Sequence, residues 1–72
     1  MPENCIAIID RLIEERHKHG MTQRDLAQST GLTQSVIARL ENKKAMPQLN
    51  TLLKVTAALG CDLMVVPTVQ QK

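Results

Sequence analysis

None of the 72 residues is a phenylalanine, tyrosine or tryptophan. A core in this chain must therefore be built from Leu, Ile, Val, Ala and Met, which bury less area per residue than aromatic side chains do. Chains this short gain little net stabilisation from burial, and association is one of the few ways to add more without disulfides or metals. No interior stretch has the composition of a linker. We expect a single domain over residues 1–72, and a dimer is a reasonable expectation before any motif is considered.

The two cysteines and the apolar segments indicate the cellular compartment. Cys5 and Cys61 stand in an otherwise ordinary composition, with neither a signal peptide nor an apolar run long enough to cross a bilayer. Two thiols in such a chain suit a reducing cytosol. We expect both to be free and largely buried, in a soluble cytoplasmic protein without a membrane partner.

The charges are unevenly distributed along the chain. Residues 1–15 contain four acidic residues and one arginine, whereas residues 16–44 contain six basic residues and two acidic ones. A basic segment attracts polyanions, although a cluster of lysines and arginines is more often only a solvated face. The distribution supports nucleic-acid binding only in combination with a motif.

Apolar residues recur at helical spacing in four segments, which predicts an all-α fold. Asn4 and Gly20 suit the two ends of the first helix, and Thr22 with Asp25 has the form of a capping box before the second. Thr33 suits the start of a third helix, in which Val36, Ile37 and Leu40 face the core. The fourth carries an apolar stripe of Leu49, Leu52, Leu53, Val55, Thr56 and Leu59. The expected helices span about residues 4–19, 23–30, 34–41 and 49–59.

The segment after Gly60 lacks helical periodicity. Its paired valines and the proline that follows favour a short edge strand over about 62–66, and a fifth helix is the competing interpretation. A lone strand cannot satisfy its backbone, so it would need to pair with the same strand of a second copy. We therefore expect residues 61–72 to form a dimerisation segment. Its apolar contacts would come from Leu63, Met64, Val65 and Val66.

Residues 22–41 fit a helix-turn-helix motif, which places its second helix in the major groove of DNA. Advancing 100° per residue along the third helix puts Gln34, Ser35, Ala38 and Arg39 opposite the inward residues. Glutamine can form two hydrogen bonds with an adenine edge, arginine can bind a guanine edge, and the alanine methyl can pack on thymine. These four residues are the predicted base-reading set.

Groups suited to DNA phosphates surround that set. The predicted phosphate contacts are Gln23, Thr33, Asn42, Lys43 and Lys44. Two of these residues lie at helix amino ends, where free N–H groups attract anions, and three lie just beyond the third helix. Such contacts would supply orientation and most of the affinity.

The strings "GMTQRDLAQSTGLTQSVIARLENKK" and "MPQLNTLLKVTAALG" resemble the Cro/phage-repressor (XRE) family, and the resemblance covers about two-thirds of the chain. It implies a lambda-repressor-like domain and the same base-facing and phosphate-facing positions. It also implies a buried ion pair between Arg16, which lies within the apolar stripe of the first helix, and Glu41. The ending "CDLMVVPT" resembles the strand of antitoxin members of the family.

The resemblance implies a transcriptional regulator that binds double-stranded DNA, with a repressor binding a pseudo-palindromic operator as a homodimer as the expected form. The alternative is an antitoxin that neutralises a partner toxin and regulates its own operon. A third possibility is a helix-turn-helix domain that has lost DNA contact and only recruits partners.

Other functional classes have weak support in the sequence. His17 and His19 are two positions apart, which directs them away from each other on a helix, so we expect no metal site. No Gly-rich phosphate loop, catalytic carboxylate pair or hydroxyl–imidazole arrangement is visible. We expect no enzyme activity, no cofactor and no small-molecule substrate.

Overall fold

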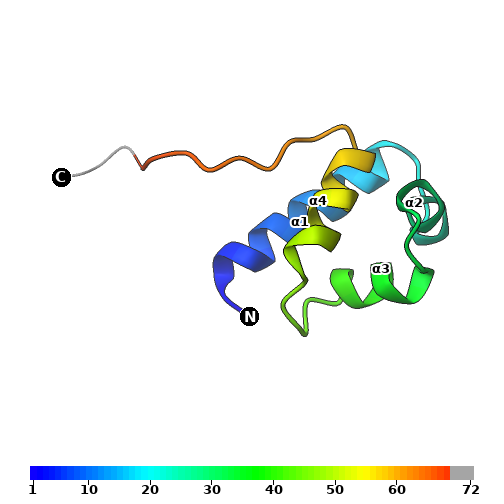
Figure 1. Ribbon diagram of the computed structural model, residues 1–72, viewed down its shortest axis with the longest axis horizontal. Helices are drawn as coiled ribbons and strands as arrows, with labels where there is room; N and C mark the ends of the chain where they lie inside the picture. Colours follow the sequence, from blue (N-terminus) through cyan, green and yellow to red (C-terminus); the bar gives the residue numbers. More distant parts are fainter. Residues whose placement is uncertain (69–72) are drawn as a thin grey trace.

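The computed structural model describes residues 1–68 and contains the four predicted helices (Figure 1). They are α1 (Glu3–Lys18), α2 (Gln23–Thr30), α3 (Gln34–Glu41) and α4 (Leu49–Ala58). Within residues 1–68 no strand is present, so the all-α expectation is confirmed. None of these helices is long and apolar enough to span a bilayer.

The ends of α2 and α3 are set by local hydrogen bonds. At the start of α2, the Asp25 N–H donates to Thr22 Oγ1 at 3.0 Å and the Thr22 N–H donates to Asp25 Oδ2 at 2.9 Å, which completes the capping box. Thr33 Oγ1 accepts the Val36 N–H at 3.1 Å at the start of α3. Between the helices, Gly31 adopts φ 75°, a left-handed conformation that glycine reaches without steric cost. Both caps were predicted from the sequence.

The first helix begins one residue earlier than predicted, at Glu3. Pro2 rather than Asn4 precedes its first residue, and the Pro2 carbonyl accepts the N–H groups of Cys5 and Ile6 at 3.1 Å. Proline suits the start of a helix because its fixed φ is preorganised and the missing N–H has no intrahelical partner there. The expectation of an asparagine cap was therefore wrong.

Side chains from all four helices form one core. Its buried members are Ile9, Leu12, Leu26, Ala27, Ile37, Leu40, Val55 and Leu59. Two apolar positions predicted to be inside are not: Leu49 and Leu53 are 63% and 45% exposed. The fourth helix buries its Val55–Leu59 side against the core, and the amino-terminal part of its stripe is left uncovered in the single chain. Val36 of α3, also predicted to face inward, is 37% exposed.

The segment that follows α4 has no regular secondary structure in residues 61–68, and the expected strand or fifth helix over 62–66 is absent from this part of the chain. Figure 1 shows it leaving the end of α4 and running away from the helices. Met64, Val65 and Val66 are 72%, 100% and 67% exposed. A strand requires a hydrogen-bonded neighbour, which one copy of the chain does not supply over these residues. Residues 69–72 of the predicted dimerisation segment lie outside the described residues.

The two cysteines are free, as expected, but neither is largely buried. Cys5 on α1 and Cys61 beyond α4 are both half-buried. The reason is their position at the margin of the core, where α1 and the end of α4 leave part of the apolar surface open.

Candidate nucleic-acid interface

The third helix presents one polar face to solvent. Gln34, Ser35 and Arg39 are exposed and Ala38 is half-buried, whereas Ile37 and Leu40 on the other side are 0% and 4% exposed. The two buried aliphatic residues anchor α3 to the core and fix the direction of the polar face. Within residues 1–68, Arg39 forms no ion pair, so its guanidinium retains its full donor capacity.

The five predicted phosphate contacts differ in how free their side chains are. Thr33 Oγ1 accepts the cap hydrogen bond and still has a hydroxyl hydrogen to donate. Asn42 Oδ1 accepts the Lys44 N–H at 2.9 Å, which leaves the amide hydrogens of Asn42 available. Gln23 donates one amide hydrogen to Glu41 Oε1 at 3.0 Å. Lys44 is exposed and forms no ion pair within the described residues.

Lys43 is held by α1. Its Nζ forms an ion pair with Asp10 Oδ1, and its side chain is 34% exposed. Its backbone has φ 62°, in the left-handed region that favours glycine, where it ends α3 and starts the loop to α4. The sequence predicted Lys43 to face a phosphate. In the free protein its ammonium group is already paired with a carboxylate of the same chain.

A buried network fixes the end of α3 relative to α1 and α2. The Arg16 guanidinium donates to Glu41 through Nε–Oε2 at 2.8 Å and Nη2–Oε1 at 2.9 Å, and through Nη1 to the Met21 carbonyl at 2.8 Å. Both side chains of this ion pair are 10% exposed. Because Gln23 also donates to Glu41, one carboxylate connects α1, the start of α2 and the end of α3. These residues fix the orientation of α3 and lie outside its exposed polar face.

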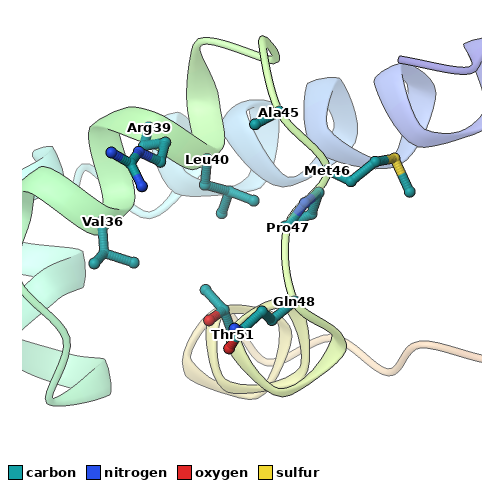
Figure 2. A pocket seen from close by; sticks show the side chains of 8 residues that line it. All are labelled: Val36, Arg39, Leu40, Ala45, Met46, Pro47, Gln48 and Thr51. Atoms are coloured by element: carbon teal, nitrogen blue, oxygen red, sulfur yellow. The ribbon is translucent and has the colours of Figure 1, made fainter.

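Two surface features near α3 were not assigned from the sequence. An open hollow of about 500 Å³ lies between the starts of α2 and α3, and its lining includes Arg24 beside Gln23 and Gln34. The position of Arg24 in the first turn of α2 could have suggested a phosphate contact. A second hollow, of about 360 Å³, separates α3 from the start of α4 (Figure 2). It is lined by Val36, Arg39, Leu40, Ala45, Met46, Pro47, Gln48 and Thr51.

The described geometry is that of two short capped helices at a glycine turn, the second with a free polar face. Comparison with known protein families matches residues 12–66 to the family described as Helix-turn-helix. The chain belongs to this helix-turn-helix family, of the Cro/phage-repressor type. The matched residues include all four helices except the first part of α1, and they extend into the segment after α4.

Relatives in the family are regulators by name. The chain is 44% identical over 62 residues to an "Uncharacterized HTH-type transcriptional regulator" of Haemophilus influenzae, covering 86% of this chain and 63% of that protein. It is 36% identical over 63 residues to the "HTH-type transcriptional regulator PuuR" of Escherichia coli, covering 88% and 34%. The chain thus spans less than two thirds of the length of either relative.

A solved structure of the family is also similar. It is titled "Toxin-Antitoxin module from Streptococcus pneumoniae", is 48% identical in sequence and has a TM-score of 0.76. The match covers 90% of this chain and 71% of that chain. The two proteins therefore share the fold, and nearly half of the matched residues are identical.

Proposed function

We propose that this protein is a sequence-specific DNA-binding regulator that reads operator DNA with α3 and acts as a repressor. The observation that carries the proposal is the free polar face of α3, with Gln34, Ser35 and Arg39 exposed and Ile37 and Leu40 anchoring the opposite side. An α-helix fits the major groove, where glutamine and arginine distinguish base pairs by their hydrogen-bonding edges. The names of the relatives support regulation of transcription. No enzyme activity enters this proposal.

Phosphate contacts would orient the domain. Lys44 and the amide hydrogens of Asn42 lie just beyond α3, and Thr33 lies at its amino end. Gln23 and Lys43 belong to the same set, with each side chain already in contact with a carboxylate of the chain. Contacts of this kind carry no sequence information but make the affinity strongly dependent on salt.

We further propose that the regulator binds as a homodimer through its C-terminal segment. The apolar side chains Leu63, Met64, Val65 and Val66 are exposed in the single copy, and the backbone around them has no strand partner within the described residues. Pairing of two such segments would cover the apolar side chains and give the backbone hydrogen-bond partners. A two-fold dimer would bind a pseudo-palindromic operator, with half-sites about 34 Å apart or a multiple of that distance.

Selection of duplexes from a random pool, repeated at two salt concentrations, tests the proposal. Enrichment of one palindromic sequence at both concentrations is expected. Gln34→Ala and Arg39→Ala should each relax the preference at one position, and Lys44→Ala should weaken binding to all sequences alike and reduce the salt slope by about one. Equal losses for the three variants on every sequence would contradict the assigned roles.

A second function, neutralisation of a toxin, is favoured by the solved toxin–antitoxin module that is 48% identical to this chain. In that case an adjacent reading frame should encode a small protein that arrests growth, and co-expression of this chain should restore growth. The chain with Arg39→Ala serves as a control, because loss of operator reading should leave direct neutralisation intact. Failure of the chain to restore growth would count against the antitoxin function.

A further inference from the structure

Val36 is an apolar residue of α3 that lies at the margin between the buried side of the helix and its polar face. It is 37% exposed, between exposed Ser35 and fully buried Ile37. A β-branched residue is a weaker helix former than alanine and is restricted in χ1. On a helix of eight residues, an exposed valine therefore adds little to helix stability, while it holds two methyl groups in a defined direction.

Val36 adjoins the predicted base-reading set. It precedes Arg39 by three positions, so the two side chains are about 60° apart around α3 and are neighbours on its surface. Both line the 360 Å³ hollow between α3 and the start of α4. Figure 2 shows Val36 and Leu40 projecting from α3 into this space, with Pro47 between them and the Met46 side chain, which points away. The lining also includes Leu40, Ala45 and Pro47, so the hollow has an apolar wall beside Arg39.

The major groove offers one apolar group to such a wall. Base edges there present hydrogen-bond donors and acceptors, except for the C5 methyl group of thymine. A cytosine at the same place would present a donor amine that valine cannot satisfy. We infer that Val36 reads a thymine methyl group beside the base pair that Arg39 contacts, and so selects thymine at that position. The inference rests on the proposed function and adds a fifth specificity residue to α3.

The test uses the operator obtained by selection, with its thymines replaced one at a time by deoxyuridine. This change removes the methyl group and leaves the hydrogen-bonding edge intact. The wild-type protein should lose about fourfold in affinity at one thymine of each half-site, the change that burial of one methyl-sized group implies. Val36→Ala should bind the thymine and uracil operators at that position within a factor of two of each other.

Two variants control for folding and for another occupant of the hollow. Alanine is a better helix former than valine, so Val36→Ala should keep the thermal midpoint of the wild type within a few degrees. Met46→Ala changes another apolar residue at the edge of the hollow and should retain sensitivity to the thymine methyl. If Val36→Ala instead weakens self-association and leaves the thymine-to-uracil ratio unchanged, a second copy covers the residue and the inference is wrong.

The outcome also separates the inference from the proposed function. Selection of an operator whose thymines show no Val36-dependent methyl effect would overturn the inference alone. If no sequence is enriched over bulk DNA at either salt concentration, both the operator-reading proposal and the inference fail. A methyl effect at one thymine that disappears in Val36→Ala supports both.

Discussion

At the scale of single residues, Glu41 connects α1, the start of α2 and the end of α3. Its carboxylate accepts two hydrogen bonds from Arg16 and one from Gln23, and its side chain is 10% exposed. Removing one member of a buried ion pair leaves the other charge without compensation. The residue lies one position before the predicted phosphate contact Asn42, yet its contacts point into the domain.

We expect Glu41→Ala to lower the free energy of unfolding by about 3–5 kcal/mol, as is typical when one side of a buried ion pair is removed. Thermal or urea unfolding measures the change. Glu14→Ala is the matched control, because Glu14 is 61% exposed and makes one long contact with Arg11 at 3.8 Å. An unfolding midpoint that is the same in Glu41→Ala as in Glu14→Ala would refute the structural role of the pair.

Asp10 and Lys43 allow a second test at this scale. The ion pair is partly exposed, so it contributes at most about 1 kcal/mol, but it occupies an ammonium group that a phosphate would otherwise bind. Asp10→Asn should therefore raise DNA affinity by up to about fivefold at low salt. In a Lys43→Ala background the same substitution should change the affinity much less.

Binding titrations of the four proteins, wild type, both single variants and the double variant, give the coupling between the two residues. Glu14→Gln removes another exposed carboxylate from α1 and controls for the general loss of negative charge. An equal gain from Asp10→Asn with and without Lys43 would mean that Asp10 does not compete with phosphate for this lysine.

At the scale of elements, α2 and α3 each begin after a threonine whose hydroxyl accepts the N–H of the residue three positions later. The Thr22 backbone N–H donates to the Asp25 carboxylate, and this hydrogen bond, followed by the nearby Thr22 hydroxyl, holds the pKa of that carboxyl below its ordinary value. A carboxylate with a lowered pKa stabilises the folded state above the unfolded pKa, about 3.9 for aspartate. That stabilisation is lost as the pH falls below this value and through the folded pKa.

The pH dependence of unfolding tests this cap. Asp25→Asn should melt at a lower temperature than the wild type at pH 6 to 7, and the difference should shrink as the pH falls below about 4. The comparison of Glu3→Gln with wild type is the control, because Glu3 lies in the first turn of α1 without a side-chain cap. A difference for Asp25→Asn that stays constant from pH 7 to pH 2 would contradict a contribution from the carboxylate.

The positions of the helices were more predictable than the extent to which each apolar side is buried. The four helices follow from periodicity, threonine caps and glycines, all of which act over a few residues. The covered side of α4 did not follow: Leu49 and Leu53 belong to its apolar stripe and remain exposed. A stripe predicts which residues can be buried, and only the neighbouring helices determine how much of it they cover.

At the scale of the whole molecule, residues 61–68 are the segment whose apolar side chains remain exposed and whose backbone has no strand partner in the single chain. Val65 is fully exposed, so its side chain packs against nothing in the described part of the chain. We expect Val65→Glu to convert the proposed dimer into a monomer, because two like charges would meet at the paired segments. Sedimentation or light scattering over a range of concentrations measures the change in mass.

The helices should be unaffected, so the helical content of Val65→Glu should equal that of the wild type. Gln28→Glu places the same charge on an exposed position of α2 and should leave the dimer intact. A dimer of unchanged affinity in Val65→Glu would exclude the C-terminal segment as the interface and would leave the exposed part of α4 as the alternative surface.

The order of amino acids was sufficient for features that depend on near neighbours. The helices, the capping box at Thr22, the cap at Thr33 and the polar side of α3 each require residues only a few positions apart, because hydrogen bonds at helix ends and the 3.6-residue period are local. Similarity to the Cro/phage-repressor family, rather than any local pattern, pointed to Arg16 and Glu41 as partners.

Tertiary structure decided the contacts between distant segments. Arg16 and Glu41 are 25 residues apart, and Asp10 and Lys43 are 33 apart. Their pairing, like the exposure of Val36, depends on the angles at which the helices pack, and no spacing in the chain encodes those angles directly. Packing therefore determined which charges are already paired and which apolar side chain is partly exposed beside the polar face of α3.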